Sequence, residues 1–459
     1  MTDSDGAQSS RGLFARIRDI FRLKRPERPP IGRPGRDLSR KTLQVQIDVV
    51  RRAFEGQLAV ATETGDDADG SFLYRPDHVL VSRDRRAELD DFFRERQSEY
   101  RGLGEVVDDR VEGLDVYRLP PRLSDGGIEV LRTLDELEQA GRSDLATPDH
   151  ILYVTVMGRV CPATEPDVPP RGGRPVPTPS KDREAGKGVR VSVVDTGWYD
   201  GAATDTDTPW LSSGVQGDLE QYNPPGTIHE YAGHGTFVAG VIRCIAPATE
   251  IEVEGFLTKG GAIYESEIAA ELMEAMRDRR HNPDLISISA GTYTYNNQPL
   301  LGFVILSTIL NLIEGEEAPL VIAAAGNDNT DQPFWPAAFP WVVSVGALEK
   351  DGRLCDFSNY GPWVDVYAHG RDLVNAFPTG TYVTYEAKTP PGQVRKFTTG
   401  LAQWSGTSFS TPIVTGAIAA YMSEHGVSAR DARDALFASA APKTDPTAGS
   451  IKAMGPPFV

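Results

Sequence analysis

Four polar residues whose types together perform acyl transfer lie where the sequence pattern changes. Asp195 ends the apolar run "VRVSVVD", and Asn327 follows the apolar run that ends in "AAAG". His234 opens the apolar stretch "HGTFVAGVI", and Ser408 lies in "SGTSFSTPIVTG", residues 405–416. Acyl transfer needs a nucleophile, a base, a group that orients the base and an oxyanion donor. Serine, histidine, aspartate and asparagine supply these four groups.

Each residue also has an ordinary structural interpretation. An aspartate after a strand is often a turn former, a serine at a helix start is often an N-cap, and an asparagine after glycine is often a turn residue. A histidine between glycines is commonly a loop residue. If all four residues had only these structural roles, their occurrence together would be four independent coincidences, so a catalytic site is favoured. The alternative is a catalytically silent protein that binds peptides. The lipases and esterases of the α/β-hydrolase class expect G-x-S-x-G and the order Ser, Asp, His, and neither is present.

The elements that must position these residues alternate from residue 189 onward. Short apolar runs predict strands at 189–195, 251–257, 284–290, 319–325 and 341–347. Helical stretches are predicted at 235–245, 266–280 and 302–315. This alternation predicts an α/β fold with a mostly parallel sheet that helices cover on both faces. Ligands bind outside the carboxyl ends of strands in such sheets, where Asp195 and Asn327 are expected.

Several segments resemble one family. "VVDTGWYD", "HGTFVAGVI" and "SGTSFSTPIVTG", in this order, are similar to the three catalytic motifs of the subtilisin-like serine peptidases, the subtilases. "PDLISISAG" (283–291) resembles the substrate-binding strand of that family, and "AAAGNDN" (323–329) resembles its oxyanion-asparagine segment. The resemblance covers roughly residues 189–440. It implies a subtilisin-like three-layer domain and a serine endopeptidase that works through an acyl-enzyme intermediate.

The resemblance also implies a role for each residue. Ser408 would be the nucleophile, His234 the base and Asp195 the group that orients the imidazole, while the Asn327 side chain and the Ser408 N–H would bind the oxyanion. The residues expected to bind substrate are Ser289, Ala290, Gly291, Ala325 and Gly326. Asp328 would favour a basic or polar P1 residue if it lay at the far end of the pocket; the alternative is a solvent-exposed carboxylate. Pro412 is expected in the first turn of the helix that carries Ser408.

The residues that precede the family resemblance, before position 189, have a different pattern. Residues 72–158 predict the order β-α-β-β-α-β, and this unit resembles the ferredoxin-like propeptide of many subtilases. The resemblance implies an intramolecular inhibitor whose last residues enter the active site; a permanently attached regulatory domain is the alternative. The predicted divisions of the chain are a basic, flexible arm (1–40), the inhibitor-like domain (41–160), a proline-rich linker (161–188), the peptidase domain (189–440) and a C-terminal tail (441–459).

Composition limits the other functions. The 459 residues carry a net charge of −18, which argues against nucleic-acid binding. Three widely spaced cysteines fit neither a disulfide framework nor a zinc ribbon. Residues 11–25 lack the apolar core of a secretory signal, so a cytoplasmic location is expected, with export by a route not visible in the sequence as the alternative. The same residues could form a basic amphipathic helix that contacts a membrane or a partner.

No cofactor is expected to be required, and no catalytic metal. Acidic residues are frequent between positions 195 and 234, where loops of the family often bind Ca²⁺. Their spacing follows no regular ligand pattern, so a structural calcium rests on the resemblance alone.

Overall fold

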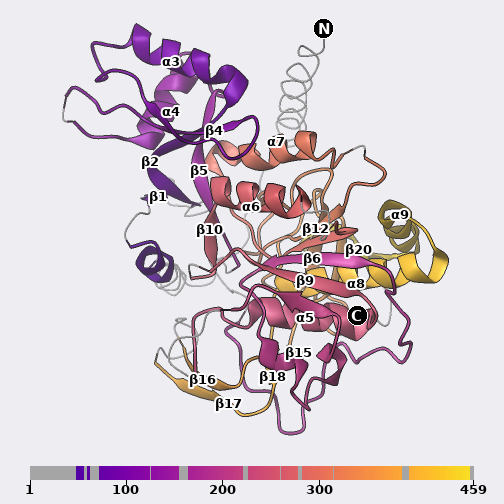
Figure 1. Ribbon diagram of the computed structural model, residues 1–459. Helices are drawn as coiled ribbons and strands as arrows, with labels where there is room; N and C mark the ends of the chain where they lie inside the picture. The colour runs from indigo at the N-terminus through magenta and orange to yellow at the C-terminus, as the bar shows by residue number, and fades with distance from the viewer. Residues whose placement is uncertain are drawn as a thin grey trace.

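The chain folds into a small N-terminal unit and a larger C-terminal unit that lie against each other (Figure 1). The computed structural model describes residues 48–55, 59–61, 72–124, 126–154, 164–220, 226–258, 260–277, 282–313, 315–384 and 392–454. The predicted basic arm and the contact expected for residues 11–25 therefore lie outside the described residues. Residues 48–53, before the strands of the small unit, are helical.

The small unit has the predicted order of elements. It consists of β2 (Phe72–Ser82), α3 (Arg86–Glu95), β3 (Glu105–Asp108), β4 (Leu114–Arg118), α4 (Val130–Gln139) and β5 (Ala146–Tyr153), and the short β1 (Ala59–Ala61) pairs with β2. The four main strands are antiparallel in the order β5-β2-β4-β3. Leu89 and Phe92 of α3 and Leu134 of α4 pack with Val79 and Val81 of β2. Both helices thus bury their apolar stripes against this sheet.

The larger unit is built on a nine-stranded sheet in the order β19-β20-β14-β13-β12-β11-β6-β9-β7. Its parallel strands are β6 (Arg190–Asp195), β7 (Val215–Gly217), β9 (Glu250–Gly255), β11 (Leu285–Ile288), β12 (Leu320–Ala324), β13 (Val343–Leu348) and β14 (Val366–His369). Nearly every residue of β11, β12 and β13 is apolar and buried, as strands covered on both faces require.

Helices cover both faces of this sheet (Figure 1). The core on one face contains α5 (His234–Ile245) and α8 (Thr407–His425), and the core on the other face contains α6 (Glu265–Arg277) and α7 (Leu301–Ile309). α9 (Ala429–Ser439) packs against α8. The expectation of a three-layer α/β fold is confirmed. No helix in the described ranges has the length and apolar character needed to span a bilayer.

Further short strands lie beside α5 and beyond the sheet. β15 (Leu373–Ala376) pairs with β18 (Leu401–Trp404), and β16 (Gly380–Val383) pairs with both β17 (Val394–Phe397) and β8 (Thr227–Ile228). They include much of the 378–404 region that precedes the Ser408 helix.

Two regions differ from the predicted divisions. Within the expected tail, β19 (Ala441–Asp445) and β20 (Gly449–Ala453) form a hairpin, and β20 pairs with β14 at the sheet edge. Within the expected linker, residues 164–188 lie along the larger unit, where Asp167 pairs with Gln403 and Val176 with Val374. The prolines of this stretch offer no N–H groups, so contacts with the larger unit hold it rather than regular secondary structure.

The two units share a sheet edge. β10 (Ala262–Tyr264), which belongs to the larger unit, pairs antiparallel with β5 of the small unit. In Figure 1, β5 and β10 continue from one unit into the other beside α6. The small unit therefore contacts the larger one through its last strand, and β2 also packs against α7.

Candidate active site

Asp195 and His234 are in direct contact. Asp195 is the last residue of β6, and His234 is the first residue of α5. The His234 Nδ1 atom lies 2.7 Å from Asp195 Oδ1 and 2.9 Å from Oδ2, and both side chains are buried. A nitrogen that contacts a carboxylate in this way carries the proton, which leaves Nε2 of the neutral ring as an acceptor.

Glycines on both sides of His234 allow this approach. A Cβ at position 235 would lie 2.5 Å from the Gly197 carbonyl oxygen and 3.1 Å from the Asp195 Cβ. Gly233 has a φ of 85° and caps α5. A larger residue at position 235 would push the start of α5 away from β6. Glycine is therefore required after His234 for steric reasons.

Glu220 is a buried carboxyl group beside this pair, and no motif around it in the sequence indicates such a role. Its Oε2 accepts a hydrogen bond from the Gly233 N–H at 2.7 Å, and the Thr196 side chain also bonds to it. Burial raises the pKa of Glu220 to about 8, and the nearby charge of Asp195 acts in the same direction. Glu220 and Thr196 together hold the loop before His234, since Thr196 Oγ1 also accepts from the Gly235 N–H at 3.2 Å.

Ser408 lies in the first turn of α8. Gly406 occupies the N-cap position and the helix begins at Thr407, so the interpretation of Ser408 as the N-cap is wrong. Its Oγ lies 3.4 Å from the carbonyl oxygen of Ser289, and no hydrogen bond joins the described side chains of Ser408 and His234. Catalytic hydrogen bonds are often long or poorly aligned before substrate binds.

Pro412 was expected in the first turn of this helix. It is the sixth residue of α8 and so lies beyond the first turn. Because proline has no N–H, the carbonyl group of Ser408, four residues earlier, lacks its usual helical donor. The Ser289 hydroxyl donates to that carbonyl oxygen at 2.9 Å. Pro412 therefore frees a group that ties the Ser408 helix to the segment after β11.

The Asn327 side chain is held in one orientation. Its Oδ1 accepts from the Thr407 N–H at 2.7 Å and from the Thr407 hydroxyl at 3.0 Å. Since a backbone N–H only donates, this contact identifies the oxygen of the amide and leaves Nδ2 as a donor directed elsewhere. Thr407 Oγ1 also accepts from the Gly326 N–H at 3.1 Å. Thr407 thus fixes the asparagine, a role that its place in the sequence beside Ser408 does not reveal.

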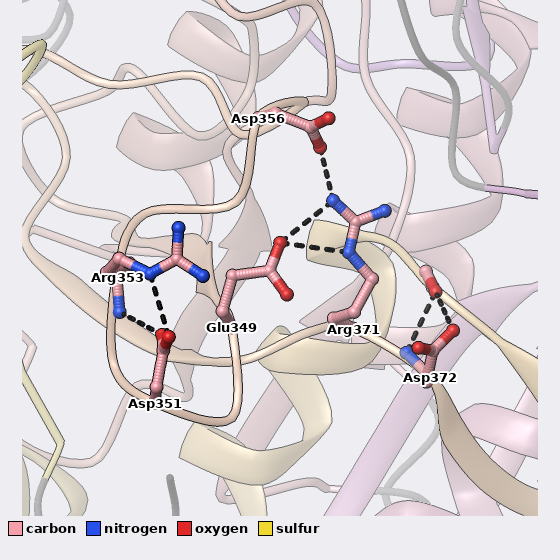
Figure 2. Close-up of polar contacts among 7 residues, drawn as sticks. Glu349, Asp351, Arg353, Asp356, Arg371 and Asp372 are labelled. Atoms are coloured by element: carbon pink, nitrogen blue, oxygen red, sulfur yellow. Dashed lines mark hydrogen bonds and ion pairs between the residues drawn. The ribbon is translucent and has the colours of Figure 1, made fainter.

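A charged cluster supports the loop that leads to Ser408. Figure 2 shows the Arg371 guanidinium directed toward Glu349 and Asp356, with Asp372 next in the chain. Arg371 Nε and Nη2 lie 3.0 Å and 2.9 Å from Glu349 Oε1. The Asp372 N–H donates to Ser405 Oγ at 2.8 Å, so the anchored segment directly contacts the residues before Ser408.

The residues expected to bind substrate are buried beside Ser408 and Asn327. Ser289, Ala290 and Gly291 follow β11, and Ala325 and Gly326 follow β12. The structure brings them and the four polar residues to the carboxyl edge of the sheet, as the topology rule predicts.

Two acidic side chains in the described part of the segment between residues 195 and 234 accept hydrogen bonds from backbone N–H groups. Asp205 Oδ1 accepts from the Asp207 N–H at 2.8 Å, and Asp218 Oδ2 accepts from the Gly255 N–H at 3.0 Å. No group of three or more His, Cys, Asp or Glu side chains among the described residues could hold a metal ion.

Comparison with known proteins identifies relatives over the larger unit. Residues 186–455 match the model of the Subtilase family. The chain is 30% identical over 269 residues to the "Intracellular serine protease" of Paenibacillus polymyxa, covering 54% of this chain and 72% of that protein. It is 27% identical over 265 residues to thermitase of Thermoactinomyces vulgaris, covering 56% of this chain and 82% of thermitase.

A solved structure extends the likeness in fold. Fervidolysin from Fervidobacterium pennivorans, described as a keratinolytic enzyme related to subtilisin, is similar with a TM-score of 0.54 and 18% identity. The superposition covers 83% of this chain and 60% of that one, so it includes residues before position 186. Because the family model matches more than half of the chain, over the unit that contains the Asp, His and Ser motifs, the chain belongs to the subtilase family and is a serine endopeptidase.

Proposed function

We propose that Ser408, His234, Asp195 and Asn327 are the catalytic residues of this endopeptidase. Ser408 Oγ attacks the carbonyl carbon of the scissile peptide while His234 Nε2 takes its proton. The C–N bond then breaks, the leaving amine receives that proton, and water hydrolyses the acyl-enzyme by the same route. Asp195 keeps the proton on Nδ1 and stabilises the imidazolium that forms in each step.

The observation that carries this assignment is the contact of His234 Nδ1 with both Asp195 oxygens, 2.7 and 2.9 Å away. It leaves Nε2 as the only ring acceptor for a serine proton. Asn327 supports the assignment, since Thr407 holds its oxygen and frees Nδ2 as an oxyanion donor. The proposed mechanism requires Ser408 Oγ, which contacts the Ser289 carbonyl oxygen at 3.4 Å, to turn toward His234 Nε2.

A fluorophosphonate tests these roles, since it forms a bond from the serine Oγ to phosphorus as fluoride leaves. We expect intact mass spectrometry to show one adduct on the wild type and none on Ser408→Ala. Ser410→Ala is the matched control, because Ser410 is also buried and lies two residues further along α8. An equal adduct on Ser408→Ala would contradict the assignment, and so would loss of the adduct in Ser410→Ala alone.

We further propose that residues 72–154 inhibit the enzyme by laying the end of β5 where substrate binds. Tyr153 and Gly291 exchange two backbone hydrogen bonds, each of 3.1 Å, and the Val154 N–H donates to the Gly261 carbonyl at 2.9 Å. An extended substrate would use these same backbone groups when it adds as a strand. Inhibition of this kind does not depend on the substrate's side chains.

Side chains of β5 support the same docking. His150 Nδ1 lies 2.9 Å from Glu265 Oε2, and His150 Nε2 accepts from the Tyr295 N–H at 3.2 Å. Asp149 accepts from the N–H and the hydroxyl of Ser266, at 3.0 and 2.7 Å. These contacts satisfy buried groups on both units, so removing one partner leaves the other unpaired.

His150→Ala tests the inhibition. We expect the fluorophosphonate to react faster with this variant than with the wild type, by about fivefold or more, because lost buried hydrogen bonds cost about 1–3 kcal/mol. His78→Ala is the control, since His78 Nδ1 contacts Pro76 within the small unit. Equal rates for all three proteins would refute inhibition by β5. Self-processing would appear as a wild-type mass shortened after β5, with Ser408→Ala full length.

The location of the protein is a further part of this proposal. We infer a cytoplasmic enzyme, and the name of the Paenibacillus relative, an intracellular protease, supports this. Cys244 and Cys355 are buried free thiols, which also suits a reducing compartment. Fractionation of cells that produce the native chain would test it, and recovery of the protein outside the cell would contradict it.

A further inference from the structure

The side chain of Phe334 occupies the space between the two segments expected to bind substrate. A Cβ at Gly291 would lie 2.9 Å from Phe334 Cδ1, and a Cβ at Gly326 would lie 3.1 Å from the same atom. The ring therefore lies within contact distance of both glycines, one after β11 and one after β12. Phe334 is 4% exposed, so the ring is enclosed rather than turned outward.

This position is next to the expected place of the P1 side chain. In the proposed reaction the P1 carbonyl carbon must approach Ser408 Oγ while its oxygen approaches Asn327 Nδ2. Ser408 Oγ contacts the carbonyl of Ser289, two residues before Gly291, and Gly326 directly precedes Asn327. A P1 side chain would therefore enter between these two segments, where the ring of Phe334 already lies.

The ring is held in place from several sides. The neighbouring residue Trp335 exchanges two backbone hydrogen bonds with Thr292, of 2.8 and 2.9 Å, which fixes this segment next to Gly291. The Tyr293 ring packs edge-on to Phe334 with centroids 5.1 Å apart. The Tyr293 hydroxyl in turn donates to Asp328 Oδ2 at 2.7 Å. Moving Phe334 aside would disturb all of these contacts.

We propose that Phe334 determines the P1 specificity of the enzyme and restricts P1 to small side chains such as those of glycine, alanine and serine. This inference rests on the proposed roles of Ser408 and Asn327. An aromatic or long basic P1 side chain would compete with the Phe334 ring for the same volume, and close-packed interiors do not absorb an extra ring without displacement. The carboxylate of Asp328 is already engaged by Tyr293, so it does not reverse this preference in favour of arginine.

Diphenyl aminoalkylphosphonates that carry only a P1 side chain test the proposal on the full-length protein. Each forms a bond from serine Oγ to phosphorus as phenoxide leaves. We would measure inactivation rates with the alanine and phenylalanine analogues and divide each by the rate with a simple fluorophosphonate in the same preparation. This division removes any difference in how far β5 covers the cleft.

We expect the wild type to react at least about 100-fold faster with the alanine analogue than with the phenylalanine analogue, since hydrophobic pockets discriminate by about 10–200-fold per methylene. Phe334→Ala should bring the two rates within about tenfold, and Phe334→Leu should give an intermediate ratio. Phe339→Ala is the control, because Phe339 is also buried and its ring packs on the Trp335 ring with centroids 4.6 Å apart. The atoms nearest to a Cβ at Gly291 or Gly326 belong to other residues.

Three results would overturn the proposal. A wild type that reacts equally with both analogues has no restriction at P1. A Phe334→Leu variant that is folded by its thermal melt and keeps the wild-type ratio shows that another residue sets it. If the wild type reacts with the phosphonates but Ser408→Ala does so as well, the proposed catalytic roles fail first, and the specificity inference falls with them.

Discussion

Replacement of Glu220 by glutamine should stabilise the protein at alkaline pH and change little at acidic pH. The carboxyl group of Glu220 has an ordinary pKa of 4.5, and burial raises it to about 8 in the folded chain. Below pH 4.5 the group is protonated in both states, so it does not affect stability. Between these two values the unfolded chain loses its proton while the folded chain keeps it, so stability falls as pH rises.

The size of the effect follows from this pH interval. Each pH unit over which only the unfolded chain is ionised costs about 1.4 kcal/mol. Across the interval from 4.5 to about 8 the loss sums to roughly 3–5 kcal/mol, and it is complete above pH 8. Glutamine does not ionise, yet its amide oxygen can still accept from the Gly233 N–H that Glu220 holds at 2.7 Å.

Urea unfolding followed by tryptophan fluorescence from pH 5 to pH 9 measures this difference. Both proteins should carry Ser408→Ala so that neither digests itself. We expect similar unfolding free energies at pH 5, and at pH 9 a Glu220→Gln protein more stable by about 3 kcal/mol or more. Other titrating groups, such as Asp149, whose pKa burial raises to about 7, cancel because both proteins contain them.

A second variant separates ionisation from the lost hydrogen bond. Glu220→Ala removes the acceptor of the Gly233 N–H at every pH, so it should be less stable than Glu220→Gln throughout, by about 1–3 kcal/mol. If the wild type and Glu220→Gln lose stability in parallel between pH 5 and pH 9, Glu220 is not a buried acid with a raised pKa, and the reasoning is refuted.

The remaining predictions concern the groups around Ser408. Asn327→Ala should lower kcat toward a peptide reporter about 10²–10³-fold with little change in KM, the range found for an oxyanion amide in subtilisin; an unchanged kcat would remove Asn327 from the oxyanion site. Thr407→Val should lower kcat about tenfold because Asn327 loses a hydroxyl donor, and Thr407→Ser should restore it; failure of serine to restore activity would point to packing instead. Gly235→Ala should reduce the fluorophosphonate rate at least about tenfold, since its Cβ would meet Gly197 and Asp195; a wild-type rate would show that α5 shifts without harm.

Much of the peptidase unit could be predicted from the sequence because its elements are encoded locally. The buried runs that became β6, β9, β11, β12 and β13 each fall within two residues of their predicted bounds. Short apolar runs that are rich in β-branched residues and bounded by turn residues are typical of strands covered on both faces. This pattern is the same whichever neighbouring element covers the strand. The N-terminal order of elements follows from the same local periodicity.

Other features depended on contacts that local pattern does not contain. The tail prediction for residues 441–459 was incomplete, since β19 and β20 are mostly polar and exposed and gain their order by pairing with each other and with β14. The linker prediction missed the docking of residues 164–188 for the same reason. The sequence places Pro412 in the first turn of α8, whereas it is the sixth residue, because helix starts are uncertain by one or two residues without the backbone geometry.

The chemistry available to this protein can be read from its residues alone. The residue types and order of Asp195, His234, Asn327 and Ser408, each next to an apolar run, specified an acyl-transfer site at the carboxyl edge of a parallel sheet. The reacting groups are the side chains themselves, so the residue types alone indicate the chemistry.

The enclosure of the site and the pKa values of its groups depend on contacts between distant segments of the folded chain. Glu220 acquires its raised pKa because the fold buries it beside Asp195, and Phe334 fills the space between Gly291 and Gly326 because three segments converge there. β5 lies against Gly291, well over a hundred residues away in the chain. The periodicity of a sequence states which face of an element is buried, but the shape and charge of a site come from distant segments that meet only in the folded chain.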